Sequence, residues 1–421
     1  MFRCGSFDVV GVGFGPSNLA LAVAVAEHNT TTPGERLSAR FVERQSTFGW
    51  HRGMLLEDAT MQISFLKDLA TLRNPVSPYG FLSYLHDRGR LIDFINYGSA
   101  FPTRLEFHDY LEWVAGRFVD DVDYRTTVTS IDPVPDASEF LDIRTSDGAT
   151  MRTRNVVVAT GLAANLPDGV VPGERIWHTR DLLTRTDRPV DPRRVIVVGA
   201  GQSAAEAVDH FHRRFESAEV WAVFNRYGYS PADDTPFANR VFDPGAVDDF
   251  FGAPPEVKQM ILGYHANTNY SVVDPELIES LYRRHYHEKI SGRERLRFLN
   301  VSRIDDVVAS RDHVELVLES MLDGGREAVR ADLVVYATGY RPSDPCDLLG
   351  DLTGSCLRDD AGRLSINRDY RVATDPALRA GIYVQGATEH THGLSSTLLS
   401  NIAVRSGEIV QSIAERTSAL V

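Results

Sequence analysis

The most constraining feature of the chain is a glycine-rich turn in the stretch FDVVGVGFGPSN at residues 7–18. A short apolar run ending at Val10 predicts a buried parallel strand, and a helix rich in Ala and Leu is expected over residues 17–26. We expect a Cβ at the first glycine to obstruct the turn, one at the second to hold a pyrophosphate away from the backbone amides, and one at the third to separate helix from strand. The turn therefore predicts a dinucleotide site at the N-terminal end of the helix. Its glycines are Gly11, Gly13 and Gly15.

The acidic residue after the next strand bears on which dinucleotide binds. Residues 39–42 predict a second strand, and Glu43 follows it. A carboxylate at this place can accept hydrogen bonds from both hydroxyls of a ribose, which fits FAD or NAD. The alternative for Glu43 is an ordinary acidic residue in solvent at the end of a strand. We favour the ribose ligand because Glu43 stands at the expected distance after the glycines.

A second glycine turn lies in the middle of the chain. Residues 194–198 form another apolar strand, and a helix is expected over residues 205–215. Two such turns predict two bound dinucleotides. The residues of the second turn assigned to its cofactor are Gly199, Gly201, Gln202 and Ser203.

The end of the following strand indicates the identity of the second dinucleotide. Strand 220–224 ends in Asn225 and Arg226 rather than in an acid. An acid would repel a 2′-phosphate, whereas an arginine pairs with it in a bidentate manner, so this domain is predicted to prefer NADPH to NADH. The alternative for Arg226 is an ordinary surface cation.

Composition limits the classes of protein that fit. A chain of 421 residues with 43% hydrophobic residues is long enough for two or three domains. The net charge of −14, without a long basic stretch, argues against a nucleic-acid or anionic-membrane partner. No secretory signal and no apolar run long enough to span a bilayer are found, so we expect a cytoplasmic protein. Three scattered cysteines, Cys4, Cys346 and Cys356, give no disulfide framework, metal site or redox dithiol.

The order of these elements predicts an α/β fold with two Rossmann-like dinucleotide-binding domains and a smaller, mostly helical substrate-binding region. Residues 120–154 alternate polar and apolar side chains with turn signals between them, as in an antiparallel β element. Strands end in Ala-Thr-Gly at residues 159–161 and again at 337–339, and the repeat suggests that the chain returns there to the first domain. The predicted boundaries are 1–188 for the first part of the first domain, 189–330 for the second domain with a substrate-site insert at about 227–290, and 331–421 for the rest of the first domain.

Two later helices are also expected. Residues 275–289 follow Asp274, which can cap the helix, and Pro275 suits the first helical position. The second helix is predicted over residues 396–414.

Segments between and after the glycine turns resemble the flavin-dependent N-hydroxylating monooxygenases, most of all the L-ornithine N5-monooxygenases of siderophore and related natural-product pathways. The resemblance covers nearly the whole chain, and these segments are far more specific than either glycine turn. They are PSN at 16–18, MQISFLKDLAT at 61–71, GAGQSAAE at 199–206, DDTPFAN at 233–239, NTNYSVV at 267–273, ATGY at 337–340 and THGLSSTLLS at 391–400.

The resemblance implies cofactors and site residues. FAD occupies the first glycine turn and NADPH the second. Lys67 binds the substrate carboxylate, and Asn239 and Asn269 hold its amino groups, with Asn269 and Gln62 as the residues of the catalytic site. The pocket is closed by the turn made of Leu394, Ser395 and Ser396. The FAD site further includes Pro16, Ser17, Trp50, His51 and Gln62. In an alignment without a gap, the arginine with which the family binds the 2′-phosphate falls at Asn225. Assigning this role to Arg226 therefore assumes a shift of one residue.

The reaction implied by the resemblance is reduction of FAD by NADPH, capture of O2 as a flavin hydroperoxide, and attack on it by a terminal amine. The attack needs a free lone pair on nitrogen, and neutralising an ammonium with a pKa near ~10.4 at pH 7 to 8 costs roughly 3 to 5 kcal/mol. A neutral amide suits the site because its carbonyl can hold the amine without stabilising the ammonium as strongly as a carboxylate would. Asn269 supplies such an amide.

The resemblance implies L-ornithine as the substrate, because the segment ISFLKDLAT at 63–71 is more similar to the ornithine enzymes than to the lysine enzymes. With the carboxylate anchored, the chain length between the two ends decides whether nitrogen reaches the flavin. L-Lysine or an aliphatic diamine is the alternative substrate. A carbon-oxidising flavin monooxygenase and an NADPH-sensing flavoprotein without catalysis are the alternative classes, while a disulfide reductase would need a dithiol that the chain lacks. The resemblance also implies a homo-oligomer, commonly a tetramer, and no metal.

Overall fold

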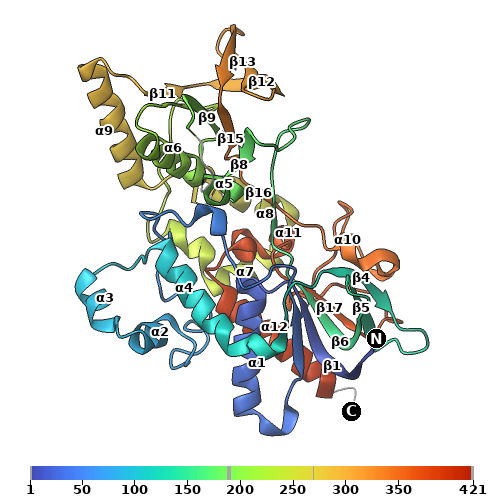
Figure 1. Ribbon diagram of the computed structural model, residues 1–421. Coiled ribbons are helices and arrows are strands. Elements are labelled where there is room, and N and C mark those ends of the chain that lie inside the picture. The colour runs from blue at the N-terminus through green and yellow to red at the C-terminus, as the bar shows by residue number, and fades with distance from the viewer. Residues whose placement is uncertain (1, 187–190, 269, 419–421) are drawn as a thin grey trace.

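The computed structural model describes residues 2–186, 191–268 and 270–418. Figure 1 shows two lobes, each built on a β-sheet, with α7 (Pro244–Gly252), α8 (Pro255–Tyr264) and α11 (Glu389–His392) between them. The predicted α/β class and its two separate sheets are confirmed. None of the helices in the described ranges combines the length and the apolar character needed to cross a membrane.

The first sheet has the strand order β3-β2-β1-β6-β5-β4, and β17 also pairs with β6. The central strand β6 pairs in parallel with β1, while its first half pairs antiparallel with β5 and its second half in parallel with β17. The antiparallel element expected over 120–154 is therefore confirmed as β4, β5 and the start of β6. The strands are β1 (Phe2–Val12), β2 (Ala39–Val42), β3 (Val122–Asp123), β4 (Val128–Pro133), β5 (Leu141–Thr145), β6 (Thr150–Val158) and β17 (Gly381–Val384).

Side chains alternate between two apolar clusters on the two faces of this sheet. Val9 and Val157 belong to the cluster that contains the buried side of α1, whereas Val10 and Val158 belong to the cluster on the opposite face. A continuous apolar run is needed because both faces of a parallel sheet are covered. This explains why β1 and β6 show no polar alternation at their carboxyl ends.

Helices cover the first of these faces. Figure 1 shows α1 and α12 side by side, and the two helices contact each other along the lower lobe. The last helix begins at Ile402 instead of the predicted 396, because residues Leu394–Thr397 form a separate 3₁₀ turn, η8. The helices of this lobe are α1 (Pro16–Thr31), α2 (Phe81–Asp87), α3 (Leu91–Tyr97), α4 (Arg104–Ala115), α10 (Cys346–Leu349) and α12 (Ile402–Ser418).

The second sheet is entirely parallel, with the strand order β11-β10-β9-β15-β8. The cap predicted for α9 is confirmed, since the Asp274 side chain accepts hydrogen bonds from the backbone N–H groups of Glu276 and Leu277. The elements of this lobe are β8 (Ile176–His178), α5 (Leu182–Thr186), β9 (Arg194–Val198), α6 (Gln202–Arg214), β10 (Glu219–Val223), α9 (Pro275–Ser291), β11 (Leu296–Leu299) and β15 (Leu333–Tyr336). A meander of three antiparallel strands extends from it: β12 (Ser302–Ala309), β13 (Val314–Ser320) and β14 (Arg326–Ala331).

The strand before the second Ala-Thr-Gly does not return to the first sheet. It is β15, which pairs with β8 and β9 in the second sheet. The short strand β8 also belongs to the second sheet, so this sheet spans residues 176–336 and extends beyond the predicted 189–330 on both sides. The chain crosses between lobes in an antiparallel ribbon made of β7 (Leu162–Ala164) and β16 (Tyr340–Pro342), directly after the two Ala-Thr-Gly motifs.

Both Ala-Thr-Gly motifs serve the glycine turn of their own sheet. A Cβ added at Gly13, where φ is +84°, would lie 2.5 Å from the carbonyl oxygen of Ala159. A Cβ added at Gly199, where φ is +140°, would collide in the same way with the carbonyl oxygen of Ala337. In each lobe the glycine is required because the carbonyl of the neighbouring strand occupies the space that a side chain would take.

The role predicted for the third glycine is wrong. Gly15 immediately precedes α1, and a Cβ added there would meet no protein atom within 4 Å. A side chain at this position would extend into open space, so the absence of one at Gly15 is not what lets the helix pack against the strand. The close backbone approach predicted for Gly15 is made by Gly13, and Gly15 leaves free space in front of the N-terminal end of α1.

We expect Gly13→Ala and Gly15→Ala to differ in stability. Gly13→Ala combines a left-handed backbone with a collision against a carbonyl, and should lower the free energy of unfolding by about 2–4 kcal/mol. Gly15→Ala should leave the melting temperature of the cofactor-free chain unchanged, because its φ is −80° and its Cβ meets nothing. Thermal unfolding by circular dichroism measures both variants, and equal losses of stability would contradict the separate roles of the two glycines.

Candidate active site

Three strands deliver the first glycine turn and the C-terminal segment to one edge of the first sheet. Val12, Val158 and Val384 are in register at the carboxyl ends of β1, β6 and β17. In parallel sheets, ligands bind outside this edge. The first turn and the segment after β17 therefore face the same space.

Glu43 is buried at this edge and is therefore not an acid in solvent at the end of a strand. Its Oε2 accepts a hydrogen bond of 2.7 Å from the backbone N–H of Phe14, and its Oε1 accepts one of 2.8 Å from that of Gln45. These bonds hold the carboxylate against the glycine turn. Each oxygen keeps a second lone pair that can accept a hydroxyl.

The first turn fits the dinucleotide that the resemblance implies. The space in front of Gly15 and the N-terminal end of α1 suit a pyrophosphate. Thr388, Ser396 and Asn401, in the segment after β17, are buried and carry side-chain polar atoms without a hydrogen-bond partner in the described protein. Buried polar groups are normally paired, so these atoms fit contacts with a bound polar molecule.

Trp50 and His51, predicted for the FAD wall, pack against each other and against the crossing ribbon. The Trp50 ring packs edge-on against His51, with centroids 4.9 Å apart, and His51 packs edge-on against Tyr340 of the crossing ribbon at 5.8 Å. The surrounding protein lowers the pKa of His51 to about 4, mainly through burial, although its ring still has an exposed surface. A side chain that is surrounded by many protein atoms but keeps a solvent-accessible surface is typical of a residue that lines a cleft. Gln62, predicted beside the flavin, also has an exposed side chain.

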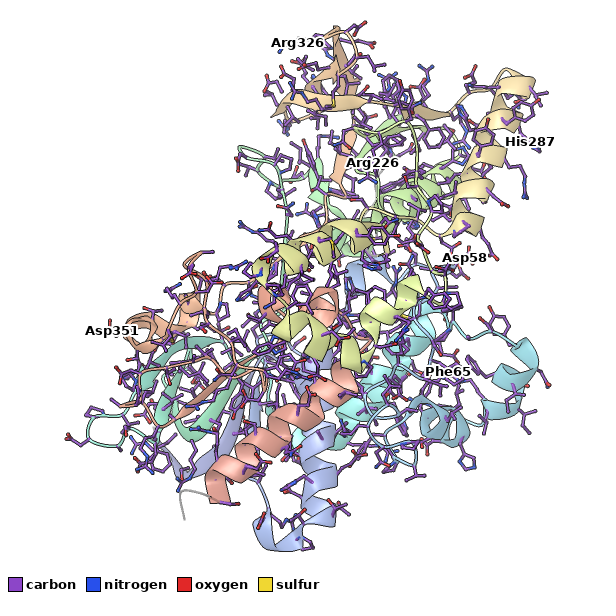
Figure 2. The ribbon with its side chains drawn as sticks, turned by 180° about the vertical axis from the view of Figure 1, so that it is seen from behind. Asp58, Phe65, Arg226, His287, Arg326 and Asp351 are labelled. Atoms are coloured by element: carbon purple, nitrogen blue, oxygen red, sulfur yellow. The ribbon has the colours of Figure 1, made fainter. Side chains whose placement is uncertain are left out.

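The second glycine turn connects β9 to α6, and a loop of the insert packs against it. Gly201 lies against the backbone of Ser271, whose carbonyl oxygen accepts a 3.0 Å hydrogen bond from the Arg226 guanidinium. Arg226 is exposed, and Figure 2 places it in the upper lobe. Its side chain is thus held close to the turn. Asn225 is also exposed.

The side chain of Gln202 has a structural use within the second lobe. Its Oε1 accepts a 2.8 Å hydrogen bond from the backbone N–H of Asp274, and its Nε2 donates to Glu206 at 2.9 Å. Both the oxygen and the nitrogen of the Gln202 amide are therefore hydrogen-bonded to protein. Ser203, the next residue of α6, is half-buried.

Lys67 and Asn239 converge on one short 3₁₀ turn, η5 (Ala238–Phe242). The Lys67 ammonium lies 5.9 Å from the ring centroid of Phe242 at the end of η5, and Asn239 lies on η5 itself. Burial lowers the pKa of Lys67, while the nearby carboxylate of Asp243 acts in the opposite direction. Figure 2 shows Phe65, from the segment that carries Lys67, in the lower lobe away from Arg226.

Two other short turns contact η5. One is η6 (His265–Thr268), which ends just before Asn269, and the other is η8, which contains the buried residues Leu394, Ser395 and Ser396. Asn269 itself lies outside the described residues. The remaining substrate residues predicted from the sequence are thus brought together, from segments more than 150 positions apart.

The helix α7 of the insert packs beside η8. Gly393, where φ is +75°, would place a Cβ 3.2 Å from the Phe250 ring. Arg368 donates to Asp248 on α7 at 2.6 Å and forms a bidentate pair with Glu408 on α12, with both distances 2.9 Å. The insert is therefore anchored to the C-terminal helix of the first lobe.

A pair of residues that joins the two lobes was not predicted. Arg104 at the start of α4 donates to both carboxylate oxygens of Glu206 on α6, at 2.9 and 2.7 Å. The pair is largely buried, and Arg104 also donates to the carbonyl of Met54 at 2.8 Å. Glu206 stands in the quoted GAGQSAAE segment, but nothing local in the sequence identifies its partner.

Comparison with known proteins places the chain among flavin monooxygenases. The family model described as L-lysine 6-monooxygenase/L-ornithine 5-monooxygenase matches residues 5–342. The chain is 42% identical over 402 residues to the L-ornithine N(5)-monooxygenase of Burkholderia cepacia, covering 92% of this chain and 90% of that protein.

Two solved structures show the same architecture. The ornithine N-hydroxylase of Kutzneria sp. 744, in a complex with reduced FAD, NADP⁺ and L-ornithine, has a TM-score of 0.95 and 47% identity, covering 98% of this chain and 100% of the other. The L-lysine 6-monooxygenase of Pseudomonas syringae has a TM-score of 0.86 and 33% identity, covering 97% and 99%.

Histidines buried beside the site give the fold a dependence on pH. Burial lowers the pKa of His392 from 6.5 to about 4, and its ring stacks on Tyr370 with centroids 4.0 Å apart. As the pH falls below 6.5, the unfolded chain binds a proton at this residue that the folded chain does not, so the contribution of His392 to stability should fall until about pH 4 and stay constant above 6.5. We expect His392→Gln to remove about 1.4 kcal/mol per pH unit from this slope. Urea unfolding between pH 7.5 and 4.5 measures it, and an unchanged slope would contradict the assignment.

Proposed function

The chain belongs to the L-lysine 6-monooxygenase/L-ornithine 5-monooxygenase family, and we propose that it N-hydroxylates the side-chain amine of L-ornithine. It is a flavin-dependent monooxygenase with FAD and NADPH as cofactors and O2 as co-substrate. The observation that carries the substrate proposal is the convergence of Lys67, Asn239 and the buried turn 394–396 around η5. The product would be a hydroxylamine suited to hydroxamate siderophores or related natural products.

Lys67 is proposed to hold the carboxylate end of the substrate. Its ammonium is half-buried over an aromatic ring, so its charge is poorly solvated. A bound carboxylate favours the charged form and offsets the effect of burial on the pKa of Lys67. This gives the site a cationic anchor at one end.

The other end of the site must receive a neutral amine. FAD, when bound, supplies the chemistry that activates O2 with electrons from NADPH. The residues of the chain then orient the amine and exclude water. The amide of Asn239 and the unpaired hydroxyl of Ser396 are neutral groups that can hold nitrogen without raising its pKa as a carboxylate would. We assign the same role to the amide of Asn269.

Substrate length separates ornithine from lysine. One added methylene moves the amine by about 1.3 Å when the carboxylate is anchored, and a misplacement of about 1 Å can cost about a hundredfold in rate. The greater similarity to the ornithine hydroxylase than to the lysine enzyme supports ornithine. We further propose a cytoplasmic location and a homo-oligomeric state.

The direct test incubates purified protein with FAD, NADPH, O2 and ornithine, lysine or putrescine, and measures hydroxylamine together with NADPH consumption. The proposal predicts hydroxylamine from ornithine at a kcat/KM at least about tenfold above that for lysine, because a difference of one methylene usually changes kcat/KM by about this factor or more. Greater activity with lysine or putrescine would replace the proposed substrate. NADPH binding without any hydroxylamine would favour the NADPH-sensing alternative.

The anchor is tested by Lys67→Met. Removing the cation should raise the KM for ornithine about 30-fold or more, the scale of a lost charge-assisted hydrogen bond. Reduction of bound FAD by NADPH, followed by its absorbance under anaerobic conditions, should be unaffected.

Lys258→Met is the matched control for the anchor. Lys258 also lies over aromatic rings, 5.6 Å from Phe250 and 5.7 Å from Phe251, and burial lowers its pKa as well. It should keep the ornithine KM within about twofold. If both lysine variants raise the KM equally, the carboxylate is not bound by Lys67.

Arg226→Ala and Asn225→Ala test which residue meets the 2′-phosphate. If Arg226 does, its removal should raise the KM for NADPH about tenfold or more while leaving that for NADH unchanged. Asn225→Ala should then have little effect on either. The ratio of kcat/KM for NADPH and NADH in the two variants decides the assignment, and the opposite result would assign the phosphate to Asn225.

A further inference from the structure

A buried arginine in the C-terminal helix has no assigned role. Arg405 on α12 is 2% exposed and forms no ion pair with a carboxylate of the described residues. Its hydrogen bonds go to neutral oxygens: Nε donates to Oε1 of Gln385 at 3.1 Å, and Nη1 donates to the carbonyls of Ser396 at 2.7 Å and Ser395 at 3.4 Å.

Such an arrangement is costly for stability. A buried guanidinium loses its hydration, and here burial lowers the pKa of Arg405, with Glu408 and Tyr370 acting on it only through space. An apolar residue would avoid this cost. What the guanidinium does provide is a rigid planar group that holds two successive backbone carbonyls through Nη1 and the side chain of Gln385 through Nε.

Those carbonyls belong to the turn proposed to close the substrate pocket. Residues 394–396 are at most 3% exposed, and η8 contacts the η5 turn that carries Asn239. A short 3₁₀ turn has few internal hydrogen bonds, so its position depends on outside contacts. Arg405 supplies two of them.

On its other side, Arg405 reaches the first glycine turn through two amides. Gln385, which accepts from Arg405, donates through Nε2 to the carbonyl of Ser17 and to Oδ1 of Asn18, both at 3.3 Å. Asn18 donates through Nδ2 to the carbonyl of Gly13 at 2.7 Å. An unbroken chain of hydrogen bonds therefore runs from the first glycine turn, here called the FAD turn, to residues 394–396, here called the pocket turn.

We propose that Arg405 is a positioning residue that fixes the pocket turn 394–396 relative to the FAD turn, and thereby sets how well the substrate amine is placed against the flavin. The inference rests on the proposed function. Its consequence is specific: Arg405 should control substrate binding and the fraction of NADPH oxidation that yields product, without contacting substrate or cofactor.

The same helix also anchors α7 of the insert. Glu408, three residues after Arg405, pairs with Arg368, which in turn binds Asp248 on α7. Arg405 and Glu408 thus connect α12 to the pocket turn and to the insert. A disturbance of Arg405 alone should loosen the turn while α7 remains anchored.

The test compares Arg405→Lys, Arg405→Met and Gln385→Leu with the wild type. Lysine keeps the charge but cannot hold Gln385 and both carbonyls with a planar fork. We expect both Arg405 variants to raise the KM for ornithine about tenfold, less than loss of the Lys67 anchor, because the pocket turn is displaced while the anchoring contact remains. The ratio of hydroxylamine to NADPH consumed should fall at least twofold, because misplaced substrate lets two electrons from NADPH and two protons convert O2 to H2O2.

Two measurements do not depend on turnover. The rise in melting temperature that ornithine causes in the holoenzyme should shrink in the Arg405 variants. FAD content per chain, from absorbance, should be retained in them but reduced in Gln385→Leu, whose amide holds the FAD turn directly. Arg405→Lys and Gln385→Leu keep the proposal testable if Arg405→Met fails to fold.

Ser412→Ala is the matched control. Ser412 is a buried polar residue of the same helix that donates to Asp369 at 2.6 Å and shares a 2.8 Å hydrogen bond with Tyr383, away from the pocket turn. Its loss should lower the melting temperature but keep the ornithine KM and the product ratio within about twofold of the wild type.

The inference would be overturned if Arg405→Lys kept the wild-type KM for ornithine, the wild-type ratio of hydroxylamine to NADPH consumed and the wild-type rise in melting temperature with ornithine. An equal rise in KM for Ser412→Ala would also overturn it. A wild-type enzyme that forms no hydroxylamine from ornithine would instead overturn the proposed function. The two failures are therefore distinct.

Discussion

The architecture depends on a contact between backbone atoms that occurs once in each lobe. The glycine that follows β1 in one lobe and β9 in the other lies directly against the carbonyl of an alanine that comes just after the adjacent strand, Gly13 against Ala159 and Gly199 against Ala337. Only a residue without a Cβ allows the strands to approach in this way while the chain turns into a helix. The contact brings a helix N-terminus to the carboxyl edge of each sheet, where a dinucleotide can bind.

The same contact explains what the sequence predicts well and where it misleads. The glycine turns and the apolar strands before them are local requirements of the backbone, so two sheets and two cofactor sites can be predicted from them. The Ala-Thr-Gly motif is also a local requirement, but of both sheets, and its repeat therefore wrongly suggests a return to the first one. Strand β8, with three residues, is too short to carry a recognisable pattern, so the true extent of the second sheet is not visible in the sequence.

Contacts between distant segments leave no local pattern at all. Arg104 and Glu206 are 102 positions apart, and Arg405 meets Gln385 and the pocket turn only after β17, η8 and α12 have packed together. Family resemblance assigns Lys67 and Asn239, because they stand in distinctive segments. It does not indicate that both converge on one short turn, which depends on the position of Phe242 under the Lys67 side chain.

The division between sheets and turns has a consequence for specificity. The two glycine turns lie at the edges of two sheets whose strands are paired in register. The residues proposed to bind substrate instead lie on or beside η5, η6 and η8, short turns outside the sheets. A methylene lengthens a substrate by about 1.3 Å, whereas one residue of 3₁₀ helix advances by about 2.0 Å. Small changes in these turns can therefore accommodate ornithine or lysine while the two sheets, and the chemistry they support, stay the same.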